Sequence, residues 1–189
     1  WTVWNEKDVR DANGVDIRSY DPEINFVEDD TTIDGYFEDE KYWKHRLDDI
    51  REWLKVAPLE MPDDMCIIGF RGGEYATVPD LFLTKDYWEE GIAIMRTINP
   101  NMRFEVHTDD PATAKQFFPD FPIIQDIGIN WRSVRYAKHL IIANSAFYIM
   151  PSLCNTNLLH KPIAPRFWAR RNTKVWARPA CYYKEFMYI

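Results

Sequence analysis

The stretch from Cys66 to Tyr75, CIIGFRGGEY, constrains the fold of this chain most strongly. It reads as a short buried strand that ends in a glycine pair beside an arginine. Two further units of a strand followed by a polar turn come later, at 106–111 and 141–147. Strand ends that open into helices are where α/β proteins hold phosphate-bearing ligands. Three such ends in order predict a nucleotide-dependent enzyme or a relic of one.

From Met65 onward, short apolar runs alternate with segments of helical periodicity. Strands are expected at Met65–Phe70, Arg103–His107, Pro122–Gln125, Leu140–Ala143 and Lys161–Ala164. Helices are expected around 42–54, from Thr84 to Ile98, after Asp110-Pro111, over Trp131–Lys138 with Asn130 as its cap, and after Asn144-Ser145. Strands that alternate with helices through short connections predict an α/β fold, a Rossmann-like parallel sheet with helices on both faces.

Charge divides the chain unevenly. Residues 1–64 hold 19 acidic and 8 basic side chains, whereas residues 65–189 hold 11 acidic and 15 basic ones, with no acid between Asp126 and Glu185. We expect residues 1–60 to form an acid-rich segment and linker helix, the remnant of another lobe, and residues 61–189 to form the ligand-binding domain. The basic stretch would attract an anion, or it is simply a set of solvated faces. Nucleic acid is not expected, because the whole chain is acidic.

No apolar run approaches the roughly 20 residues that cross a bilayer, so no transmembrane segment is expected. The sequence shows no signal-peptide pattern, and its start at Trp1 rather than Met indicates a processed end or missing upstream sequence. The three cysteines, at 66, 154 and 181, have no paired spacing. We therefore expect a cytoplasmic protein.

Arg71 is the sharpest candidate site residue. At the end of a strand and followed by Gly72 and Gly73, its guanidinium could hold a pyrophosphate bidentately while the backbone comes close. The competing interpretation is a structural arginine paired with a carboxylate such as Glu74.

The run His107-Thr108-Asp109-Asp110 allows three interpretations. Imidazole and carboxylates are metal ligands, but adjacent carboxylates at a helix start are more often caps. Contact with a base or sugar, through Asp109 or the backbone, is favoured over a metal site, so His107, Asp109 and Asp110 are candidate ligand-binding residues and no metal is expected.

The run Asn144-Ser145-Ala146-Phe147 follows a strand and opens a helix. A hydrolase nucleophile at Ser145 would need flanking small residues and a following acid and histidine, and the chain lacks this order. A helix start that offers free N–H groups and the Ser145 hydroxyl to a phosphate fits better.

Five ordered segments resemble motifs of the family 11 α-1,2-fucosyltransferases. Residues 35–43 (GYFEDEKYW) resemble their GYFQSxxYF, 69–75 (GFRGGEY) their HxRRGDY, and 106–110 (VHTDD) their FSDD. Residues 138–147 (KHLIIANSAF) resemble their CKHNIIANSSF, and 161–168 (KPIAPRFW) their KxVIAPxxW. The chain departs from these motifs at Gly69, where the family has His, at Gly72, where it has Arg, and at Glu74, where it has Asp. Residues 148–153 replace a WWGAW segment, and the family's glycine-rich N-terminal segment is absent.

The resemblance implies the donor-binding half of an inverting GT-B glycosyltransferase. The expected donor substrate is GDP-fucose, the acceptor a glycan hydroxyl, and no other cofactor is expected. Arg71 would hold the donor phosphate, and Glu74 would be the general base, unless the missing lobe supplies it. Two alternatives remain: a non-catalytic nucleotide- or carbohydrate-binding module, and a transferase that uses another nucleotide sugar.

Overall fold

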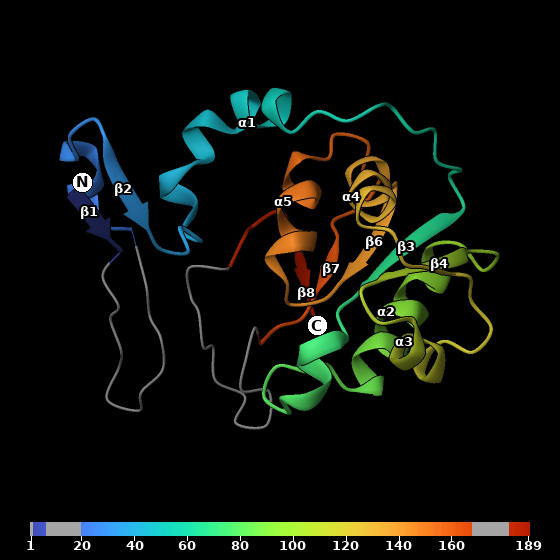
Figure 1. The fold of residues 1–189 in the computed structure, drawn as a ribbon. Helices are drawn as coiled ribbons and strands as arrows, with labels where there is room; N and C mark the ends of the chain where they lie inside the picture. The colour runs from blue at the N-terminus through green and yellow to red at the C-terminus, as the bar shows by residue number, and fades with distance from the viewer. Residues whose placement is uncertain (1, 7–19, 168–181) are drawn as a thin grey trace.

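The computed structural model describes residues 2–6, 20–167 and 182–189 (Figure 1). Its helices are α1 (Leu47–Trp53), α2 (Lys85–Ile98), α3 (Pro111–Phe117), α4 (Ile127–Tyr136) and α5 (Ala146–Cys154). Its strands are β1 (Thr2–Asn5), β2 (Thr31–Asp34), β3 (Met65–Phe70), β4 (Arg103–Thr108), β5 (Ile123–Ile124), β6 (His139–Ile142), β7 (Ile163–Ala164) and β8 (Met187–Tyr188). Within these ranges, no helix is both long enough and apolar enough to cross a lipid bilayer.

Six strands form one parallel sheet in the order β5-β4-β3-β6-β7-β8. Within this sheet, the first strand along the chain is the central strand β3. The chain then moves outward through β4 to β5, and returns to the other side of β3 with β6. This is the strand order of dinucleotide-binding Rossmann folds, in which ligands bind where the direction of winding reverses. The predicted α/β fold with a parallel sheet is confirmed.

Helices cover both faces of this sheet, with α2 and α3 on one side and α4 and α5 on the other (Figure 1). On the first face, Gly91 of α2 approaches the side chain of Ile141 closely. On the second face, Gly69 of β3 lies against the ring of Tyr148 in α5. Because both faces are covered, the central strand β3 is apolar throughout instead of alternating.

The core is centred on β3 and is rich in aromatic rings. Ile67, Ile68 and Phe70 have no exposed surface. The Phe70 ring contacts the rings of Trp88 and Phe118 at centroid distances of 5.4 and 5.6 Å. Aromatic pairs of this kind add to the stabilisation that burial alone gives.

The N-terminal part is a separate small sheet in which β1 and β2 pair in parallel. The buried Glu6 carboxylate accepts hydrogen bonds from the N–H groups of Tyr36 and Phe37. The Tyr183 hydroxyl donates to the Glu38 carbonyl at 2.7 Å, so this part also contacts the C-terminal segment. All strands of the larger sheet lie within residues 65–188, and the domain boundary at residue 60 stays a prediction.

Two local features differ from what the sequence predicts. Asn130 does not cap α4, because the helix begins at Ile127 and the Asp126 side chain accepts from the Ile129 N–H at 2.7 Å. The edge strand β8 was not predicted from the sequence, since two residues give no usable periodicity. The helix start at Asp110-Pro111 is confirmed, with Asp110 accepting from the Thr113 N–H.

We expect acid to destabilise the protein through His139, the first residue of β6. Burial lowers the pKa of this imidazole, and the nearby His160 and Lys138 oppose its charging, while the Asp63 carbonyl at 2.9 Å favours it. The unfolded chain therefore binds a proton near pH 6.5 before the folded one does, so stability is lost as the pH falls below about 6.5. Urea unfolding between pH 7 and 5 should show this loss, and His139→Gln should reduce it. His139→Gln with an unchanged pH dependence would contradict the assignment, and His45→Gln, at an exposed position, is the control.

Candidate functional site

A pocket lies at the carboxyl edge of the sheet, where β3, β4 and β5 end and α4 and α5 begin. Its volume is about 270 Å³. Its lining comes from four chain segments and consists of Arg71, Thr108, Asp109, Gln125, Asp126, Ile127, Asn130, Phe147 and Tyr148. Three of the predicted site residues, Arg71, Asp109 and Phe147, therefore meet in one pocket. Its position matches the edge at which parallel α/β sheets bind ligands.

Arg71 is held by two carboxylates. Its Nη1 donates to Asp109 Oδ2 at 2.6 Å, and its Nη2 donates to Glu74 Oε1 at 3.1 Å. The guanidinium also lies over the ring of Tyr75, 5.3 Å from its centroid. The Arg71 side chain is still 29% exposed and Glu74 is 75% exposed, so both pairs face solvent. Exposed ion pairs contribute about 0–1 kcal/mol, which a tighter ligand contact can exceed.

The glycine pair binds the turn after β4 through its backbone. Gly72 N–H donates to Asp109 Oδ1 at 3.0 Å, and Gly73 N–H donates to Asp110 Oδ2 at 3.2 Å. Gly73 has a φ of 45°, and a Cβ there would lie 2.5 Å from Asp109 Oδ2. Carboxylates thus occupy the positions that a phosphate was expected to take beside Arg71 and these N–H groups.

Hydrogen bonding holds the Asp110 carboxylate in its charged form. Bonds from the side chain and N–H of Thr113 lower the pKa of Asp110, with a smaller contribution from Gly73. This side chain is a helix cap first, as the alternative interpretation of the sequence proposed. It does not line the pocket.

Tyr148 lines the pocket and links the ends of β3 and β4. Its hydroxyl lies 3.1 Å from the Phe70 carbonyl and 2.9 Å from the His107 carbonyl. Burial raises the pKa of this phenol, which therefore keeps its proton and remains a donor. Gly69 makes room for the ring, since a Cβ at this position would lie 2.7 Å from Tyr148 Cδ1. The chain can therefore carry no side chain at 69 while Tyr148 keeps this place.

The expectation that His107 contacts a ligand is corrected by the structure. Its side chain has no exposed surface, with Nδ1 at 2.9 Å from Asn130 Oδ1 and Nε2 at 2.8 Å from Glu105 Oε1. The bond to His107 lowers the pKa of Glu105. Both ring nitrogens are therefore used inside the protein, and His107 cannot join Asp109 and Asp110 around a metal ion. Its role is to orient Asn130, whose Nδ2 donates to the Thr108 carbonyl.

The run 144–147 divides between support and pocket. Asn144 is buried, and its Nδ2 donates to the Leu81 carbonyl at 3.0 Å. Ser145 is the N-cap residue of α5, and its side chain makes no capping hydrogen bond. The first N–H groups of the helix, which begins at Ala146, have no intrahelical partners. Phe147 lines the pocket and packs against Trp131 at 5.8 Å.

None of the described basic residues in the stretch after Asp126 lines the pocket. Arg132 donates to the carbonyls of Ala57 and Pro58, and Lys138 pairs with Asp63. Lys161 donates to the Lys184 carbonyl. Basic residues of this stretch at 170, 171, 174 and 178 lie outside the described residues. Among the described lining residues, Arg71 is the cation, against Asp109 and Asp126.

Sequence reasoning missed Gln125, Asp126 and Asn130. Gln125 Nε2 donates to the Asp109 carbonyl at 3.1 Å, which ties the end of β5 to the end of β4. The signal was present, because Pro122–Gln125 was predicted as a strand and its end must lie at the same edge. Assigning Asn130 as the helix cap moved the helix start away from this edge.

No family model, curated protein or solved structure matches this chain. The resemblance to fucosyltransferases therefore rests on the motifs alone.

Proposed function

We propose that this chain is the donor-binding half of a nucleotide-sugar-dependent glycosyltransferase, with GDP-fucose as its donor. The observation that carries the proposal is a pocket at the carboxyl edge of a parallel sheet with the Rossmann strand order, and this pocket has an arginine on its rim. Three motifs that resemble the fucosyltransferase sequences supply the turns after β3, β4 and β6. The nucleoside would enter the pocket beside Phe147, and the acceptor would be a glycan hydroxyl.

In the proposed reaction, the acceptor oxygen attacks the anomeric carbon, the bond from that carbon to the phosphate oxygen breaks, and GDP departs. Negative charge grows on the β-phosphate, and Arg71 with the first N–H groups of α5 would stabilise it. Glu74 is exposed beside Arg71 and would accept the proton of the acceptor hydroxyl. Binding of the diphosphate requires Arg71 to exchange Asp109 for phosphate. A charge-assisted phosphate contact of about 1.5–3 kcal/mol exceeds the exposed ion pair that it replaces.

A second function is favoured by the carboxylates that already bind Arg71 and the two glycine N–H groups. With Asp109 and Asp126 in the lining, the pocket suits an uncharged polar ligand. The protein would then be a non-catalytic module that binds a nucleoside or a sugar.

Calorimetry in the presence of excess chelator separates the two functions. Transferase donor binding predicts that GDP binds more tightly than guanosine. A non-catalytic module predicts that guanosine or fucose binds and that phosphates add nothing. Absence of binding by all of these, and by other nucleotide sugars, would contradict both proposals.

Asp109→Asn is expected to raise the affinity for GDP about tenfold. Two unit charges 4 Å apart interact by about 4 kcal/mol near a protein surface, and solvent screening of this partly exposed side chain reduces that to about 1.4 kcal/mol. Affinity for guanosine should not rise, because it carries no phosphate. The matched control is Asp64→Asn, which removes the other Asp–Arg pair between β3 and β4, at the opposite edge of the sheet. Unchanged GDP affinity in Asp109→Asn would favour the non-catalytic module.

A further inference from the structure

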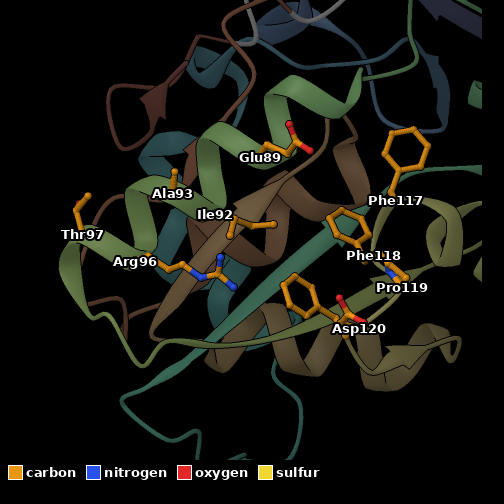
Figure 2. A pocket seen from close by; sticks show the side chains of 10 residues that line it. Glu89, Ile92, Ala93, Arg96, Thr97, Phe117, Phe118, Pro119 and Asp120 are labelled. Carbon is orange, nitrogen blue, oxygen red and sulfur yellow. The ribbon is translucent and has the colours of Figure 1, made fainter.

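A second and larger pocket lies on the face of the sheet that α2 and α3 cover, between α2 and the turn that follows α3 (Figure 2). Its volume is about 590 Å³, within the range of small-molecule sites. One wall is a stripe of α2 residues at helical spacing, and the other is the segment 117–121. Ile92 and Arg96 point from the helix toward Phe118 and Asp120 (Figure 2). None of the residues assigned to the proposed donor site lines this pocket, so the inference below does not depend on that function.

Two residues that line this pocket, Phe118 and Phe121, belong to a row of stacked aromatic rings. Phe121 stacks on Phe104 with a centroid distance of 5.1 Å and an interplanar angle of 21°. Phe118 stacks on Phe121 at 6.1 Å and 17°. Phe118 is almost fully buried, so the row is fixed by the core beneath it. A flat apolar group that enters the pocket meets ordered ring surfaces, which favour an aromatic ligand.

Two charged side chains on the rim make no ion pair within the part of the chain that the structure describes. Arg96 lies over the ring of Phe104 at 5.5 Å, whereas Arg51, Arg71 and Arg103 each bind a carboxylate. Of the two acidic side chains that line the pocket, Asp120 is the one that makes no ion pair with another described residue. The nearby Lys115 donates to the Pro119 carbonyl instead, and Glu89, the other acid of the lining, binds Lys85 at 3.5 Å.

We propose that this pocket binds an aromatic α-amino acid as its zwitterion. Arg96 would take the carboxylate, Asp120 would take the ammonium group, and the stacked phenylalanines would hold the ring. The charges decide between ligand classes. An aromatic acid without an amino group would leave the charge of Asp120 without a partner. An aromatic amine would leave the charge of Arg96 without one, whereas a zwitterion pairs with both.

Calorimetry of the full chain with phenylalanine and tyrosine tests the proposal. We expect saturable binding, with 3-phenylpropionate and phenethylamine each at least tenfold weaker and alanine weaker still. Equal binding of 3-phenylpropionate would overturn the zwitterion assignment, and absence of binding by both amino acids would overturn the site.

Three substitutions locate the ligand. Arg96→Gln and Asp120→Asn should each weaken phenylalanine binding about tenfold or more, since each removes a charge-assisted contact. Ala93→Trp should abolish binding by filling the pocket from an exposed position of α2, and an unchanged urea midpoint would show that the protein remains folded. Arg46→Gln, at an exposed arginine outside the pocket, is the matched control. Loss of affinity in the control, or full affinity in Arg96→Gln and Asp120→Asn, would overturn the proposal.

Discussion

Arg71→Ala is expected to weaken GDP binding by roughly 10- to 150-fold. The substitution removes a charge-assisted contact of about 1.5–3 kcal/mol. It also removes the guanidinium that offsets the charges of Asp109 and Glu74, and these charges then repel the diphosphate. Arg71→Lys should recover only part of the affinity, because an ammonium group lacks the planar fork of guanidinium. Calorimetry with GDP measures both effects.

Arg103→Ala is the control that separates loss of a defined contact from loss of net positive charge. Arg103 binds Asp64 through two hydrogen bonds at the opposite edge of the same two strands. Its removal changes the net charge equally but leaves the pocket intact, so GDP affinity should hardly change. Equal losses at Arg71 and Arg103 would indicate general electrostatic attraction and no defined phosphate site.

Gly69→Ala is expected to lower the free energy of unfolding by about 3 kcal/mol. The new methyl group would lie 2.7–2.9 Å from three ring atoms of Tyr148. That ring is 2% exposed and cannot move away without breaking the bonds of its hydroxyl to Phe70 and His107. Overpacking in a core of this kind costs about 1–3 kcal/mol, and the displaced hydroxyl adds to it. Urea unfolding gives the value.

Gly128→Ala should behave in the opposite way. A Cβ at Gly128 meets only Asp126 Oδ1 at 3.4 Å, and alanine is favoured over glycine in a helix by up to about 1 kcal/mol.

In a Tyr148→Ala background, the cost of Gly69→Ala should largely disappear, since the clash is removed. A cost that is the same in both backgrounds would falsify the Tyr148 explanation.

The sheet could be predicted from the sequence because its central strands β3 and β6 are almost entirely apolar. Runs such as Met65–Phe70 and Leu140–Ala143 need no partner information to be recognised as buried. The error at α4 has a local cause, because Asp126 and Asn130 are both good cap residues, four positions apart. Local chemistry alone does not decide between them, and the sheet edge does.

The contents of the site were harder to predict than its place. That Arg71, Asp109 and Phe147 would meet at one edge follows from parallel strand ends. The sequence could not predict that Asp109 would bind Arg71 and the Gly72 N–H. Spacing along the chain does not fix the distances between the turns that follow neighbouring strands. For the same reason, His107 was assigned to a ligand although its partners are Glu105 and Asn130.

The central position of β3 has a consequence for synthesis on the ribosome. β3 is the first strand of the large sheet to be made, yet it pairs with β4 on one edge and β6 on the other. From Phe70 to Ile142, translation at about 5–20 residues per second takes about 4–14 s. During this time an uncharged strand without proline has an unpaired edge, which is the kind of segment that aggregates. The nascent chain is therefore most vulnerable in a strand that the folded protein buries almost completely.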